Sequence, residues 1–116
     1  MPTGFENVAA QARGVFYDVF SSQVSYAQGN VTANFVAIKS SPGDRMKTEE
    51  EAAVWAEFSE FVLKTSSIGS IIPKRGDSIT AEGKTWRVLS PSEMMPVYEF
   101  IDSEEMELRI FCKLTE

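Results

Sequence analysis

The chain has 116 residues and a hydrophobic fraction of 43%, which suits one globular domain, 1–116, that can bury a core without a disulfide or a metal. Its formal net charge of −6 disfavours a protein whose main task is to bind nucleic acid, because neutralising phosphates requires clustered Lys and Arg. It contains no histidine, the commonest general base and metal ligand. We therefore expect neither an enzyme nor a cofactor.

Three further features predict a chain made in the cytoplasm. Cys112 is the single cysteine, so no internal disulfide can form. No apolar run approaches the ~20 residues that cross a bilayer, and residues 1–6 lack the basic and apolar stretches of a signal peptide. We expect no membrane partner.

The N-terminal segment predicts an amphipathic helix over about 4–18. Thr3-Gly4-Phe5-Glu6 matches a capping box, in which Thr3 and Glu6 satisfy free amides of the first turn. An apolar stripe at helical spacing follows: Phe5, Val8, Ala9, Ala12 and Phe16.

From Gln23 onward the apolar period changes to two, which predicts short strands separated by turns. Glu82-Gly83 is a tight hairpin connection, because Gly readily adopts positive φ. The expected strands are 23–27, 31–38, 78–81, 85–89, 97–101 and 108–114. This spacing of strands indicates a mainly β fold, a small antiparallel barrel or sandwich over about 23–114 with an N-terminal helix and a long loop.

The strongest loop signal lies at about 40–51, where turn residues continue into the polar run 47–51. Loops of this length without their own secondary structure tend to be functional or disordered, so we expect a mobile arm that contacts a partner or a neighbouring subunit. The candidate contact residues are Ser40, Ser41, Pro42, Gly43, Asp44, Arg45, Met46 and Lys47.

Residues 52–66 fit two patterns. Val54, Phe58, Phe61 and Val62 form a helical stripe that a capping box at 48–51 could start, but the same stretch also alternates as a strand does. The strand composition of 61–66 favours a strand over about 54–66. The first half stays open between helix and strand.

Several short motifs have an ordinary structural interpretation that outweighs a functional one. Arg75-Gly76-Asp77 spells an adhesion tripeptide but is typical of a turn. Asn30-Val31-Thr32 matches a glycosylation pattern that a cytosolic chain does not use. The acidic clusters 49–51 and 102–105 lack calcium-loop spacing and indicate a solvated surface. Cys112 fits a buried apolar position.

Two groups of residues could bind a partner. Four aromatic residues could form a stacking platform for single-stranded nucleic acid, although core packing or a protein interface is favoured because no basic groove accompanies them. Those residues are Tyr26, Trp55, Trp86 and Tyr98. Met94-Met95-Pro96 suits an adaptable protein contact if exposed, or partial burial under its loop.

One stretch of the chain resembles a known family. Residues 72–79 and 82–88 resemble the Pro-x-x-Gly-Asp, x-Ile, Gly-x-x-Trp/Tyr-x-Val stretch of phage head–tail joining proteins, also called head-closure or stopper proteins of long-tailed phages. The matching residues are Pro73, Gly76, Asp77, Gly83 and Trp86. The order of the parts agrees over about 5–114, although the Glu-rich stretch 49–60 and Met94-Met95-Pro96 depart from the pattern.

The resemblance implies a structural protein of a phage or prophage virion, made in the host bacterial cytoplasm and located at the head–tail junction. It implies a subunit that is monomeric alone and assembles into a six-fold ring below the portal and its adaptor. The ring would close the DNA-filled head and present a surface to the tail terminator, with loop 40–51 contacting neighbours or lining the channel. No catalytic residues and no sequence-specific nucleic-acid contacts are implied.

A different class of protein stays open as the alternative: a small β-barrel binding module for single-stranded nucleic acid or a regulatory protein partner. It predicts salt-sensitive binding to single strands, which a head–tail joining subunit does not.

Overall fold

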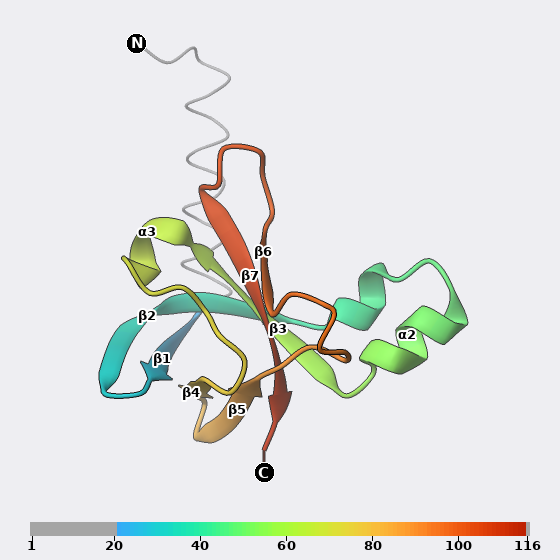
Figure 1. Cartoon of the computed structure of the whole chain (residues 1–116), viewed down its shortest axis with the longest axis horizontal. Helices are drawn as coiled ribbons and strands as arrows, with labels where there is room; N and C mark the ends of the chain where they lie inside the picture. The colour runs from blue at the N-terminus through green and yellow to red at the C-terminus, as the bar shows by residue number, and fades with distance from the viewer. Residues whose placement is uncertain (1–20, 116) are drawn as a thin grey trace.

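The computed structural model describes residues 21–115. In this range the chain forms seven strands, two short helices and one 3-10 turn, shown in Figure 1. In chain order they are β1 (Ser22–Gln28), β2 (Val31–Ser40), η1 (Pro42–Arg45), α2 (Glu49–Trp55), β3 (Phe58–Lys64), α3 (Thr65–Ile68), β4 (Ser78–Ala81), β5 (Lys84–Val88), β6 (Tyr98–Phe100) and β7 (Glu107–Leu114). The helix predicted over 4–18 lies outside the described residues.

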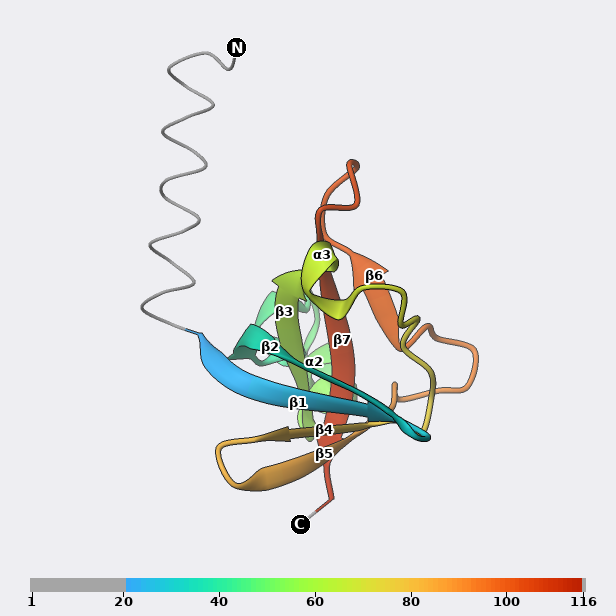
Figure 2. The same cartoon turned by 90° about the vertical axis from the view of Figure 1, so that its left-hand side faces the viewer.

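The described strands close into an antiparallel barrel (Figure 2). The strand order is β3-β2-β1-β4-β5-β7, and β7 pairs back onto β3 through Phe58↔Lys113 to Lys64↔Glu107. β6 pairs with β7 as an additional short strand. Closure removes the free edges of the sheet. The predicted fold class, a mainly β antiparallel barrel, is confirmed.

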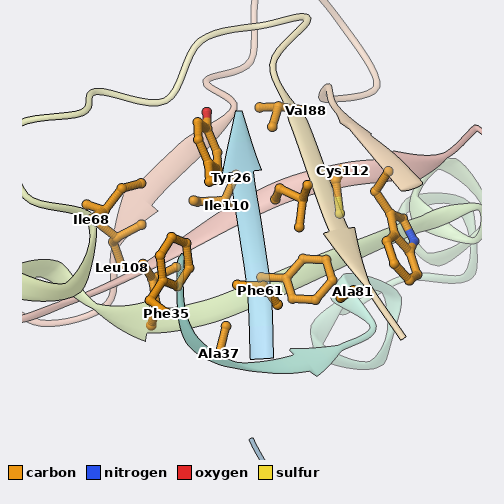
Figure 3. Packing of buried hydrophobic residues seen from close by; sticks show 14 of the residues in the cluster. Tyr26, Phe35, Ala37, Phe61, Ile68, Ala81, Val88, Leu108, Ile110 and Cys112 are labelled. Atoms are coloured by element: carbon orange, nitrogen blue, oxygen red, sulfur yellow. The ribbon is translucent and has the colours of Figure 1, made fainter. Parts of the chain in front are cut away.

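Alternating side chains of the strands fill the barrel interior (Figure 3). Tyr26, Leu63 and Ile110 are 0% exposed, and Phe61 is 1% exposed. Each of these residues lies on a strand whose intervening residues point outward, as the period of two requires. Ile68 of α3 also contributes to this core at 4% exposure, so the single helical turn after β3 closes one part of the barrel.

The predicted hairpin turn between β4 and β5 is confirmed. Glu82 and Gly83 both have positive φ, 53° and 77°, which is the requirement of a two-residue turn that matches strand twist. Gly adopts this conformation at little cost in free energy, whereas the Cβ of Glu82 crowds its backbone and makes the same conformation unfavourable.

The segment between β2 and β3, residues 41–57, is named the insert. It was expected as a structureless loop over 40–51, and this expectation is wrong for η1 and for the first turn of α2. The Thr48 hydroxyl accepts a hydrogen bond from the Glu51 amide (3.1 Å), so the capping box does begin a helix. The strand expected over 54–66 begins only at Phe58, because α2 continues to Trp55.

Candidate functional site

The family-like turn is held by one carboxylate. Asp77 Oδ2 accepts hydrogen bonds from the Tyr26 hydroxyl (2.5 Å) and from Gln28 Nε2 (2.9 Å). It also accepts from the Lys74 amide (2.9 Å) within the turn. Burial, and then the hydrogen bond to Asp77, raises the pKa of Tyr26 well above its usual range. The carboxylate therefore fixes the turn to β1 across the barrel wall.

The other residues of this turn motif also serve the fold. Gly76 has φ +96°, which an L side chain rarely adopts, and its amide donates to the Val88 carbonyl (2.9 Å). Pro73 is buried, and Trp86 is 2% exposed and packs edge-on against Phe61 with ring centroids 5.4 Å apart. These contacts show that the residues of the motif stabilise the barrel.

The Arg75-Gly76-Asp77 tripeptide is not presented as an adhesion loop. The Asp77 carboxylate is occupied by its hydrogen bonds, and the Arg75 guanidinium donates to Ser90 Oγ (2.7 Å) and to the Ser92 carbonyl (2.9 Å). These contacts tie the turn to the loop that precedes β6. The interpretation as a structural turn fits the geometry.

The insert is fixed to the outside of the barrel by a buried acid. Glu60 of β3 is 1% exposed and pairs with Arg45 of η1, while the Ser40 hydroxyl donates to the same Oε1 atom (2.9 Å). Arg109 of β7 lies 3.7 Å from Glu60 Oε2 and pairs with Glu99 at 3.1 Å. Burial, and then the charge of Arg109, lowers the pKa of Arg45. Four charges of alternating sign thus link the insert, β3, β7 and β6.

This network is incompletely satisfied. Glu60 Oε2 and Arg109 Nε are buried and have no hydrogen-bond partner, although their charges attract each other. A buried ion pair without a full set of hydrogen bonds contributes little net stability, because desolvation offsets the attraction. The network therefore positions the insert more than it strengthens the fold.

Aromatic side chains cover the rest of this contact. The Trp55 ring of α2 packs on Phe111 with centroids 4.8 Å apart and on Phe58 with centroids 5.6 Å apart. Phe111 is 5% exposed although it points away from the barrel core. The insert thus makes a second, smaller apolar contact on the outer face of β3 and β7. Figure 1 shows η1 and α2 projecting sideways from the barrel.

The predicted contact residues divide into three sets by burial and contact. Pro42 is buried, and Arg45 is engaged with Glu60, so these two hold the insert in place. Asp44 and Lys47 are exposed, as are Ser40 and Ser41. Gly43 and Met46 are half-buried. The accessible part of the insert is extended by the first turn of α2, residues 49–51, which is exposed and acidic.

Glu60 is the site residue that sequence reasoning missed. It lies in the Glu-rich stretch 49–60, and an acid on an outward-facing strand position gives no sign of burial. Only its neighbours Phe58 and Val62, apolar residues on the same outward face, indicated that something covers this side of the strand.

The aromatic platform is not assembled. Tyr26 and Trp86 lie inside the barrel (Figure 3 labels Tyr26). Trp55 of α2 packs on Phe111, and Tyr98 packs against Phe100 on β6. The favoured interpretation, core packing, fits this arrangement. The alternative of a single-strand binding surface loses the feature on which it rested.

The remaining candidates for a nucleophile, a metal site or a membrane span find no support among the described residues. Burial raises the pKa of the Cys112 thiol to about 12, so it is a poor nucleophile. Within residues 21–115 no group of three or more Cys, Asp or Glu side chains could hold a metal. None of the helices in that range is long and apolar enough to span a membrane.

The described residues thus form a closed barrel whose turn motif stabilises the fold and from which the insert projects. The family model described as phage head-tail joining protein matches residues 5–116. Because the match covers nearly the whole chain, the chain belongs to the phage head–tail joining protein family, and the resemblance is confirmed. Its role is that of a structural protein of the virion. No curated protein matches the sequence.

Proposed function

We propose that copies of this chain form a ring that closes the DNA-filled head and provides the attachment surface for the tail. The observation that carries the proposal is the family match over residues 5–116. The partners would be the portal or its adaptor on one side and the tail terminator on the other. A barrel closed on itself supports this role, because a ring subunit needs a stable body from which contact segments project.

We assign the insert to contacts with a neighbouring subunit or to the wall of the channel through the ring. It is stabilised on the barrel by Glu60 and Trp55, yet Asp44 and residues 47–51 on its outer surface are polar and exposed. A segment anchored at its base and exposed along its edge can contact a neighbouring subunit or the channel without deforming the barrel.

The acidic character of this edge suggests how DNA passes. A ring of subunits with net charge −6 places a negative field around its channel, which repels DNA and prevents it from adhering to the wall. Glu49, Glu50 and Glu51 of α2 are exposed and would contribute to that field.

Replacing these three acids tests the channel role. Glu49→Lys, Glu50→Lys and Glu51→Lys together should slow DNA ejection, measured by release of DNA from purified virions. The Gln versions are the matched control, because they also remove the favourable interaction of acids with the helix N-terminus but add no positive charge. An unchanged ejection rate with the Lys version contradicts the acidic-channel proposal.

The ring itself is tested by electron cryomicroscopy of tail-less, DNA-filled heads. We expect density for a ring of this chain, with six copies, below the portal vertex. Heads that keep their DNA and lack that density would contradict the proposed function.

A further inference from the structure

Large apolar side chains gather at two places on the outward face of the described barrel strands. The first place is formed by Phe58 and Phe111, on which Trp55 of the insert packs. The second place lies on two adjacent strands and is named the β2–β3 patch. It consists of Val36 and Ile38 of β2 and Val62 of β3.

The β2–β3 patch is continuous across the two strands. Ile38 lies opposite Val62 in the strand pairing, and both point outward because their neighbours Ala37 and Phe61 fill the barrel interior. Val36 is 38% exposed, and Ile38 and Val62 are half-buried. The outward positions of β1, β4 and β5 hold polar or small residues instead: Gln23, Ser25, Ala27, Ser78, Thr80, Thr85 and Arg87.

The chain enters the barrel beside this patch. Ser22 of β1 pairs with Ala37 of β2, so the antiparallel register places Ser21 next to Ile38. Figure 2 shows β1 and β2 side by side at this point. Residues 1–20 precede Ser21 and include the helix predicted over 4–18. From residue 18 to Ser21 the chain spans at most about 11 Å, so the end of the predicted helix lies within reach of the patch.

A helix of this length requires a surface on which to pack. An isolated helix of about 15 residues is only marginally stable in water, and packing of its apolar face supplies most of the stability of a helix in a protein. The predicted helix has such a face, and the β2–β3 patch offers apolar area that packing would remove from water. A short tether gives the segment a high effective concentration at the patch of its own chain, which favours that patch over the same patch on another copy.

We infer that residues 4–18 fold as a helix whose apolar stripe packs on the β2–β3 patch of the same barrel. The stripe consists of Phe5, Val8, Ala9, Ala12 and Phe16. This contact does not depend on the proposed ring. It assigns the outer face of β2 and β3 to a segment of the chain itself and withdraws that face from contacts with other subunits.

Crosslinking within one chain tests the contact. The natural thiol, Cys112, is 0% exposed and does not compete with engineered cysteines. In the purified variant Ala12→Cys/Val36→Cys, a short bismaleimide should join the stripe to the patch. The matched control is Ala10→Cys/Val36→Cys, because Ala10 has nearly the same tether but faces another side of the predicted helix. The Ala12 variant should form the internal crosslink several-fold faster than the Ala10 variant.

Mass spectrometry of the digested monomer measures the internal crosslink, and a denaturing gel detects covalent dimers. Equal rates in the two variants would show that the segment meets the patch only as a flexible tether, and would overturn the inference. Dimers joined from residue 12 to residue 36, in place of the internal crosslink, would put the segment on the barrel of another copy and overturn it as well. Both results leave the ring proposal standing.

Amide hydrogen exchange gives an independent test. Amides of residues 8–16 should exchange several-fold more slowly in the wild type than in Val36→Lys, because the variant places a charge beneath the packed helix. Val31→Lys is the matched control, since Val31 is 54% exposed on the same strand, and it should leave these rates unchanged. Protection of Cys112 from a thiol reagent verifies that the barrel stays folded in each variant. Equal exchange of residues 8–16 in the wild type and Val36→Lys would contradict the inference.

Discussion

The barrel and the insert are stabilised by different means. The barrel interior is apolar and closed by strand pairing on every side, with Tyr26, Leu63 and Ile110 fully buried. The insert contacts the outside of the barrel through one buried carboxylate, Glu60, and one aromatic ring, Trp55. Apolar burial scales with area and makes the barrel one cooperative unit, whereas the insert depends on a few contacts that can be lost without unfolding the barrel.

Three reporters can separate the responses of the barrel and the insert. The chain has two tryptophans, and Trp55→Phe leaves Trp86, 2% exposed in the barrel, as the fluorescent probe. The rate of amide hydrogen exchange in α2 reports local opening of the insert. Reaction of Cys112 with a thiol reagent follows opening of the barrel, because this thiol is 0% exposed.

The largest effect is expected from a cavity in the barrel. Phe61→Ala removes a ring that is 1% exposed and packs against Trp86. We expect a loss of about 3–5 kcal/mol in the free energy of unfolding, with both regions lost together. Urea denaturation followed by Trp86 fluorescence measures it, and a loss below about 1 kcal/mol would show that this ring is not part of the cooperative core.

The second largest loss of stability is expected at the turn that Asp77 fixes to β1 in the barrel wall. Asp77→Asn keeps the shape but removes the charged acceptor of the buried Tyr26 hydroxyl, and should cost about 2 kcal/mol. Tyr26→Phe removes only the donor and should cost about 1 kcal/mol. A double-mutant cycle measured by urea denaturation should give a clear coupling energy; additive losses would mean that the two groups stabilise the barrel independently.

A smaller effect, confined to the insert, is expected from Glu60→Gln. The change leaves Arg45 without its carboxylate partner and leaves Arg109 with Glu99 alone, so α2 amides should exchange faster while Cys112 stays protected. We expect about 1 kcal/mol or less for global unfolding. Glu57→Gln, which removes an exposed ion pair with Lys113, is the matched control and should change neither reporter. Faster Cys112 reaction in Glu60→Gln would mean that insert and barrel are one unit.

The smallest effect is a gain. Glu82 has φ 53°, and Asn tolerates this conformation better, so Glu82→Asn should raise the free energy of unfolding by about 0.5 kcal/mol. The midpoint of urea denaturation, followed by Trp86 fluorescence, measures this gain in the barrel without a contribution from the insert. A fall in the midpoint would indicate that the hydrogen bond from the Ser22 hydroxyl to Glu82 outweighs backbone strain.

The contrast also explains what the sequence could predict. Strands with one buried face keep a period of two, so the barrel and its turn at Glu82-Gly83 were predicted. At β3 both faces are covered, the inner by the core and the outer by the insert, and the alternation that marks a strand is obscured. The boundary between α2 and β3 was therefore placed wrongly.

Site residues were predictable only where chemistry is local. Gly76 and Asp77 stood out as turn residues, but the partner of Asp77, Tyr26, lies 51 positions away and no local pattern connects them. The burial of Glu60 depends likewise on Arg45 and Arg109 from other elements. The acidic turn at 102–105 was interpreted as solvated surface, and residues 103–105 are exposed. Its sequence does not reveal that Ile101 and Met106, the apolar residues beside it, are exposed as well.

Joining of heads to tails by this protein can be measured directly. The most direct measurement mixes DNA-filled heads and free tails, both produced in the absence of the chain, with the purified protein, and counts joined particles by electron microscopy. The account predicts that joined, infectious particles form only when the protein is added. Equal joining with and without the protein would contradict it.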